Sequence, residues 1–91
     1  MSESITVTLG GNQSKSVQRI FSQQESYVVK WKNTTQQRNK IYVDVDGDRV
    51  HSQRVGATSN GEFKGDAAKT IDVSIRDQNP EVTVTIKTGI F

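Results

Sequence analysis

Apolar and polar side chains alternate along most of the chain with a period of two residues. The alternation is clearest in residues 71–76 and 82–87, where each Val or Ile is followed by a polar residue. Successive side chains of an extended strand point to opposite faces, so both runs predict strands with one apolar and one polar face. The polar connection 77–80 ends in Pro80, which has no N–H for a sheet ladder, and it predicts a hairpin loop between the two runs. The apolar face of this hairpin needs a second sheet to cover it.

The same period predicts strands at residues 4–9, 27–32 and 40–46. In the second of these runs, Trp31 shares its parity with Val29. We expect it in the core, since large aromatic side chains dominate small β cores.

Residues 17–21 form a shorter and less regular apolar patch. They predict a strand in which either Val17 and Phe21 or Ile20 points inward. The polar residues 22–26 that follow predict a turn.

A tight turn is predicted at Asp46-Gly47, because this dipeptide suits the positive φ angles of a hairpin. Residues 48–55 then form the returning strand. Val50 and Val55 fall on opposite parities, which predicts a bulge or an early strand end near residues 52–53.

The longest stretch without a period is 56–70, which predicts an irregular loop that Phe63 holds to the core in a short strand. The polar segment 33–39 predicts a shorter connection. Long irregular loops in compact domains usually carry function or move, so 56–70 is the best loop candidate for a site.

No stretch has the period of a helix, and the predicted strands recur about every ten residues. This spacing predicts an all-β fold, an antiparallel β-sandwich of about seven or eight short strands, with a small β-barrel as the alternative. We find no internal repeat, and residues 1–91 are predicted to form a single domain.

Composition narrows the class of protein. The chain has no cysteine, which excludes disulfides, thiol nucleophiles and zinc sites built on Cys. No apolar run approaches the ~20 residues of a membrane span, and the N-terminus lacks a signal pattern, so we expect a soluble protein. The compartment is not indicated. Twelve Lys and Arg against ten Asp and Glu leave a net charge of +2, which argues against nucleic acid as the partner.

Positive charge is nonetheless unevenly placed. Lys30, Lys32, Arg38 and Lys40 lie in a stretch without acidic residues, and Tyr42 follows on the polar parity. Such a set suits an anionic partner, with Tyr42 as a stacking surface. The simpler interpretation, which we favour, is that these lysines prevent edge-to-edge aggregation of strands.

Asp44, Asp46 and Asp48 alternate around a glycine and resemble the opening of a calcium loop. The pattern then departs from such a loop, since Arg49 stands where glycine is needed and Val55 where the bidentate glutamate should be. A hairpin turn explains the same residues, so we treat calcium as a secondary hypothesis.

His51 is the single histidine and is expected to be a solvated strand residue. No nucleophile motif accompanies it, and the acidic residues fall mostly at turns or polar parities. We therefore predict that the protein is not an enzyme.

The leading hypothesis is a non-catalytic binding or assembly module that contacts a glycan or a protein through loops and a polar sheet face. The candidate ligand-binding residues are Asn33, Thr35, Arg38, Tyr42, Asn60 and Lys64. An alternative is a small defence or toxin-like protein acting on a membrane or receptor, with Ile90 and Phe91 available for homo-oligomerisation. A calcium-dependent module built on the three aspartates is the other alternative.

Overall fold

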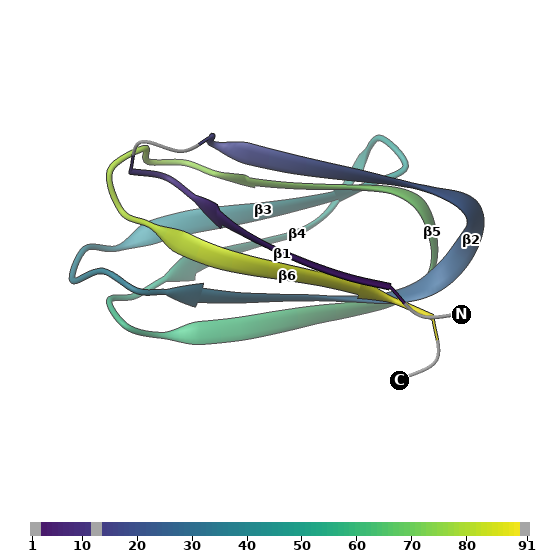
Figure 1. Cartoon of the computed structure of the whole chain (residues 1–91). Coiled ribbons are helices and arrows are strands. Elements are labelled where there is room, and N and C mark those ends of the chain that lie inside the picture. The colour runs from purple at the N-terminus through teal and green to yellow at the C-terminus, as the bar shows by residue number, and fades with distance from the viewer. Residues whose placement is uncertain (1–2, 12–13, 90–91) are drawn as a thin grey trace.

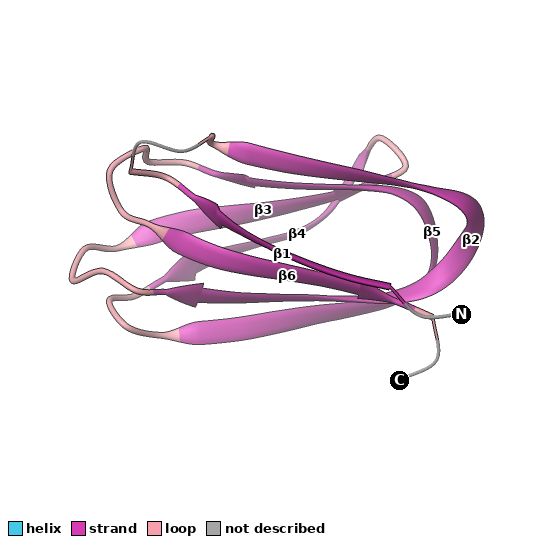
Figure 2. Ribbon diagram, in the orientation of Figure 1, coloured by secondary structure: helices cyan, strands magenta, loops and turns pink. Residues whose placement is uncertain are grey.

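The structure is a computed structural model that describes residues 3–11 and 14–89, and it is all-β (Figures 1 and 2). Neighbouring strands are antiparallel throughout. The strands are β1 (Glu3–Leu9), β2 (Ser16–Asn33), β3 (Asn39–Val45), β4 (Asp48–Val55), β5 (Asn60–Ile75) and β6 (Val82–Thr88).

One hydrogen-bonded sheet, in the order β1-β6-β2-β5-β3-β4, folds over on itself to make two layers. The fold-over is possible because β2 and β5 are long and bent, as the right side of Figure 1 shows. Residues 16–20 of β2 pair with 70–74 of β5 beside β3 and β4, and we call this layer A. Residues 27–33 of β2 lie between β6 and the start of β5, beside β1, and we call this layer B.

The antiparallel β-sandwich predicted from the sequence is confirmed, with its strands distributed differently. The expected turn at 22–26 is wrong, because β2 is continuous there. The pairing of β2 with β5 shifts register on both sides of Glu25, and such irregularities bend a strand without ending it.

The expected irregular loop at 56–70 is also wrong from residue 60 onward, because β5 begins at Asn60. Its inward positions include Gly61 and Gly65, whose cross-strand partners are Trp31 and Tyr27. The alternation was therefore present, but glycine at the inward positions hid it.

The hairpin at Asp46-Gly47 is confirmed, since these residues have φ angles of 51° and 89°. The predicted bulge exists but lies nearer the turn. Val43 pairs with His51 and Asp44 with Arg49, so Val50 is the extra residue, and it is 41% exposed.

The predicted hairpin across 77–80 is wrong. The strand that precedes this connection lies in layer A, whereas β6 pairs with β1 and β2 in layer B. Alternation identifies which face of a strand is buried but not which strand lies beside it. The burial itself was predicted correctly, because Val73 and Val84 are both 0% exposed.

The core fills the space between the two layers. Trp31 is 2% exposed, as expected. Of the two registers considered for the first part of β2, the one with Val17 and Phe21 inward is correct, and Ile20 is 66% exposed. No helix in the described part of the chain is long and apolar enough to cross a membrane. Ile90 and Phe91 lie outside the described residues.

Candidate functional site

The outer face of layer B carries lysines and hydroxyls in rows that run across the strands. Lys30 of β2 has Thr85 of β6 and Glu62 of β5 as its cross-strand partners. The row continues onto β1, where the hydroxyls of Thr6 and Thr85 are 3.0 Å apart. We call this surface the lysine face, and its residues are Val28, Lys30, Lys32, Asn60, Glu62, Lys64, Thr83, Thr85 and Lys87.

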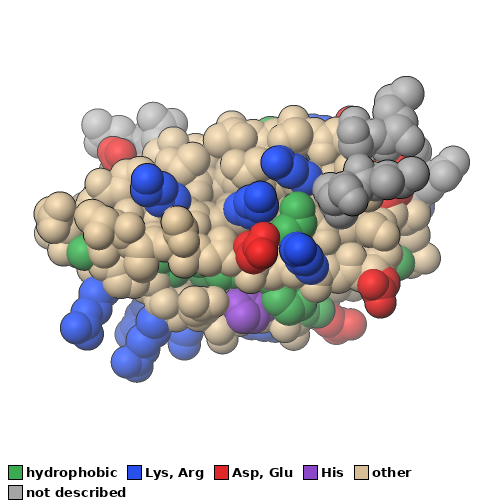
Figure 3. Space-filling model, turned by 90° about the horizontal axis from the view of Figure 1, so that it is seen from below, with side chains coloured by type: hydrophobic (Ala, Val, Ile, Leu, Met, Phe, Trp, Pro, Cys, Tyr) green, Lys and Arg blue, Asp and Glu red, His purple; other side chains and the backbone are tan. Residues whose placement is uncertain are grey.

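Two adjoining hollows mark the lysine face. One of about 400 Å³ lies beside Lys32 and Asn60, and one of about 310 Å³ lies over Val28, with Lys30 and Glu62 lining both. Figure 3 shows this side of the molecule, with blue cationic side chains gathered around a red acidic one and a small green patch. Val28 is 4% exposed although it points outward, and it lines the second hollow together with Lys30, Lys64 and Lys87.

Among the residues that the structure describes, none forms an ion pair with a lysine of this face. Within residues 3–11 and 14–89, ion pairs join Arg19 to Glu3 and Arg49 to Asp44, both away from the lysine face. Lysines often protect sheet edges from aggregation, but β2 and β6 are interior strands of layer B. Protection of a sheet edge therefore does not explain Lys30, Lys32 or Lys87. The interpretation favoured from the sequence, that the lysines prevent edge-to-edge aggregation, does not account for these three.

The structure divides the predicted basic set between two surfaces. Lys30 and Lys32 belong to the lysine face, whereas Lys40 and Tyr42 lie on the outer face of layer A, on the opposite side of the sandwich. Arg38 accompanies Lys40 beside a hollow of about 160 Å³. These residues cannot act together on one small ligand.

The ring of Tyr42 is already engaged by cations of the same chain. The guanidinium carbon of Arg49 lies 4.4 Å and the Nζ atom of Lys40 5.4 Å from the ring centroid. The Asp44 carboxylate accepts a hydrogen bond from Arg49 Nε at 2.8 Å, which raises the pKa of that guanidinium. Tyr42 is therefore a weaker stacking platform than its outward parity suggested.

Asn33 and Thr35 hold two loops together. Asn33 is 0% exposed, and its Nδ2 donates to the carbonyl oxygens of Gln37 and Gly56 at 2.6 and 3.2 Å. Its Oδ1 accepts from the backbone N–H and the hydroxyl of Thr35 at 3.0 and 2.6 Å. The amide of Asn33 is therefore buried and hydrogen-bonded within the protein, and a ligand contact by this residue stays a prediction.

Asn60 and Lys64 are brought together with the lysine face, as the start of β5 is its outer strand. Sequence inspection missed Glu62, Lys87 and the two threonines of this face. The available signal was their parity, since Glu62 shares it with Lys64, and Lys87 continues the outward positions of its strand.

Two of the three aspartates predicted as metal ligands, Asp44 and Asp46, are engaged within the protein. The carboxylate of Asp44 is bonded to Arg49, and Oδ1 of Asp46 accepts from the backbone N–H groups of Lys69 and Thr70 at 3.0 and 2.9 Å. Among the residues that the structure describes, no group of three or more His, Cys, Asp or Glu side chains could hold a metal ion. These carboxylates stabilise the hairpin and its contact with β5.

His51 was expected in solvent but lies between the layers at one edge. Its ring is 4.8 Å from that of Phe63 and 5.6 Å from that of Trp31, and Nε2 is 3.1 Å from Gln53 Oε1. His51 is partly exposed, and the bulge at Val50 makes it the cross-strand partner of the buried Val43.

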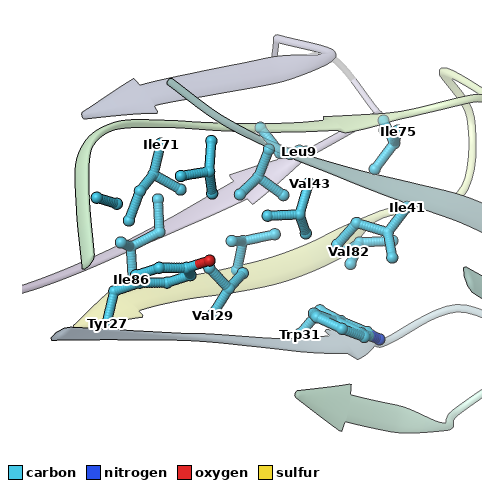
Figure 4. Close-up of a cluster of buried hydrophobic side chains, with 14 of the residues drawn as sticks. Leu9, Tyr27, Val29, Trp31, Ile41, Val43, Ile71, Ile75, Val82 and Ile86 are labelled. Carbon is cyan, nitrogen blue, oxygen red and sulfur yellow. The ribbon is translucent and has the colours of Figure 1, made fainter. Parts of the chain in front are cut away.

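Tyr27 and Trp31 of layer B are buried beneath the lysine face, and Phe63 is partly buried against the core. Figure 4 shows Tyr27, Val29 and Trp31 on the same side of β2, directed toward the core. Tyr27 is 4% and Trp31 2% exposed. The lysine face therefore presents amines, hydroxyls and amides, which suit charge pairing and hydrogen bonding but offer no stacking surface.

No protein-family model and no curated protein matches the sequence. Several solved structures share the fold. One is the CBM36-1 domain of a multidomain xylanase from the hindgut metagenome of Trinervitermes trinervoides, at 15% identity and a TM-score of 0.54, with 92% of this chain and 77% of that one covered. Another is a carbohydrate-binding module CBM36 in complex with calcium and xylotriose, at 12% identity and 0.53, with 93% and 86% covered. PirA matches at 13% identity and 0.54, with 94% and 93% covered. At these identities the likeness shows the fold alone.

Proposed function

We propose that this protein is a non-catalytic binding module whose lysine face takes an acidic polysaccharide. The observation that supports this proposal best is a set of four lysines beside threonine hydroxyls on an open sheet face, none of which forms an ion pair with any residue in the described part of the chain. Such a surface offers donors to carboxylates and to sugar hydroxyls over several strands.

The spacing of the donors suits an extended polymer. Lys30 and Lys32 are two residues apart on one strand, so their side chains emerge about 7 Å from each other. Lys87 and Lys64 flank Val28 on the two neighbouring strands. Ammonium groups are strongly hydrated point charges on flexible stems, so we expect binding that is reversible and weakened by salt.

The lysine face suits a ligand that is held by charge pairing and not by stacking on aromatic rings. This favours an acidic polysaccharide over a single-stranded nucleic acid or a neutral polysaccharide. Single-stranded nucleic acids are held by aromatic side chains on which the bases stack. In layer B, Tyr27 and Trp31 are buried, and Phe63 is partly buried against the core. A neutral polysaccharide would leave the lysines unpaired. The fold that the protein shares with carbohydrate-binding modules supports a glycan over other acidic polymers by analogy only.

The test is calorimetric titration at low salt with polygalacturonate, neutral xylan and polyglutamate. We expect binding to polygalacturonate and none to xylan. Lys30→Gln with Lys64→Gln removes two charge pairs of about 0.7 kcal/mol each and so weakens binding about tenfold.

The matched control is Lys15→Gln with Lys69→Gln, because both lysines are exposed and lie outside the lysine face. This control should bind as the wild type does. Equal binding of xylan, or full affinity in the Lys30 and Lys64 variant, would contradict the proposal. Tighter binding of polyglutamate than of polygalacturonate would assign the face to an acidic protein instead.

A further inference from the structure

Three cations form a single row on the outer face of layer A, away from the lysine face. Arg54 of β4 is the cross-strand partner of Lys40 of β3. The N–H of Arg76 donates to the carbonyl of Lys40 at 2.9 Å, which extends the pairing of Ile41 with Ile75 by one step. The three side chains therefore emerge side by side from adjacent strands.

Arg38 brings a fourth cation to the same corner. The cations surround a hollow of about 160 Å³ whose lining residues are Arg38, Asn39, Lys40, Arg54, Arg76 and Asp77. Asp77 is the single carboxylate in this set. In the described part of the chain, the ion pairs are elsewhere, so none of the four cations is neutralised by Asp77.

A buried amide fixes the frame on which these cations stand. Asn39 is 3% exposed, and its Nδ2 donates to the carbonyl oxygens of Asp77 and Pro80 at 3.1 and 3.2 Å. Its Oδ1 accepts from the N–H of Asp77 at 3.0 Å. The start of β3 and the connection after β5 are thus held together, which keeps Lys40 and Arg76 at a constant separation.

Lys40 contacts the ring of Tyr42, but among the described residues no ion pair offsets the repulsion between the cations of this row. Strands in a sheet are about 4.8 Å apart, and like charges directly opposite one another destabilise it. Protection of an edge explains Arg54 on β4 but not Lys40 or Arg76, because β3 and β5 are interior strands of layer A. A bound anion would remove this repulsion.

We propose that this corner is a binding site for an oxyanion group, a phosphate or a sulfate. Guanidinium groups present parallel N–H donors that match two oxygens of such a group. The next row inward supplies hydroxyls, since Tyr42 has Ser52 and Ser74 as its cross-strand partners. The oxyanion is either a free ion or an ester on a larger molecule.

The first test is thermal unfolding in 10 mM phosphate or sulfate against chloride at the same ionic strength. We expect the oxyanions to raise Tm by roughly 3 °C or more, because a ligand that binds the native state stabilises it. Arg54→Gln with Arg76→Gln should raise Tm in dilute chloride, since repulsion is relieved, and should abolish the oxyanion effect. Absence of an oxyanion effect in the wild type, or its persistence in this variant, would overturn the proposal.

Two further arms make the result specific. Lys30→Gln with Lys64→Gln alters the lysine face and should keep the full rise in Tm with oxyanions. The oxyanion site is therefore tested separately from the proposed glycan binding. Arg54→Lys keeps the positive charge but loses the parallel N–H donors of the guanidinium. It should therefore reduce the rise in Tm that phosphate or sulfate causes. Titration with glucose 6-phosphate and with inorganic phosphate then shows whether the oxyanion is a free ion or part of an ester. Tighter binding of the ester indicates an esterified ligand, and equal binding indicates a free ion. Either result supports the site.

Discussion

The indole of Trp31 lies against the backbone of Gly61, its cross-strand partner, so closely that a Cβ on Gly61 would stand 2.8 Å from Nε1. The same relationship recurs four residues along β5, where the ring of Tyr27 occupies the space in which a Cβ of Gly65 would lie. An aromatic ring that folds over a cross-strand glycine shields its backbone and fixes the register of the pair. The lysine face is the other side of these same strands.

Alanine at Gly61 or Gly65 should destabilise the protein. The added methyl group would displace an indole or phenol ring that is packed in the core, and overpacking of this kind costs about 1–3 kcal/mol. Gly56→Ala is the matched control, since its Cβ would meet only Ser59 Oγ at 3.6 Å. Chemical denaturation should give a lower midpoint for the first two variants and an unchanged or slightly higher one for the third. Equal midpoints in all three would show that the rings do not pack on the glycines.

Asn33→Ala should destabilise the protein by about 2 kcal/mol or more, because it leaves buried backbone groups of two loops without hydrogen-bond partners. Asn79→Ala changes an exposed amide and should stay within about 0.5 kcal/mol of the wild type. Thermal or urea unfolding measures both. If the Asn33→Ala protein instead kept the stability of the wild type and lost ligand binding, that result would support Asn33 as a ligand-contact residue.

Asp46 should act as a structural anchor and not as a metal ligand. Asp46→Ala removes the acceptor for two backbone N–H groups at a position with positive φ, and we expect a loss of about 1–2 kcal/mol. Asp46→Asn keeps the acceptor and tolerates the positive φ, so it should remain close to wild type. Calcium or a chelator should leave Tm unchanged, since a ligand of the native state would raise it. A calcium-dependent Tm that Asp46→Asn abolishes would contradict this account.

Alkaline pH should unfold the protein partly through Tyr27. Burial raises the pKa of its hydroxyl above the usual 10.0, and the carboxylates of Asp46 and Asp66 raise it further. The unfolded chain therefore releases this proton at a lower pH than the native state does, and stability falls as the pH rises above about 10. Tyr27→Phe has no such proton, so its stability should decline less steeply between pH 9 and 11. Parallel curves for the two proteins would exclude Tyr27 as the source.

The period of two was enough to predict the class of fold and nearly all of the buried faces, because burial of alternate side chains is what makes these strands stable. It could not show which strands pair. The connection 77–80 was predicted to be a hairpin loop because apolar and polar residues alternate in the strands on both sides of it. These strands lie in different layers. The bends of β2 and β5 were hidden for a related reason, since polar residues at a bend resemble those of a turn.

The candidate site was only partly accessible to sequence reasoning. Lys30 and Lys32 could be assigned to an outward face by parity, whereas Lys64 was a candidate only as a loop residue, and the structure places the three on one face. Their combination with Lys87 depends on β6 lying beside β2, a pairing between residues far apart in the chain. The burial of Asn33 was not predicted, because a polar residue beside a polar loop gives no sign in the sequence of being buried.

The most direct test of the lysine face is a titration of the ¹⁵N-labelled protein with short oligogalacturonates, followed by NMR. We predict that the changes in amide chemical shift concentrate at Lys30, Lys32, Lys64 and Lys87 and that they diminish as salt is added. Shifts confined to the loops at 34–38 and 56–59, or none at millimolar oligosaccharide, would contradict it.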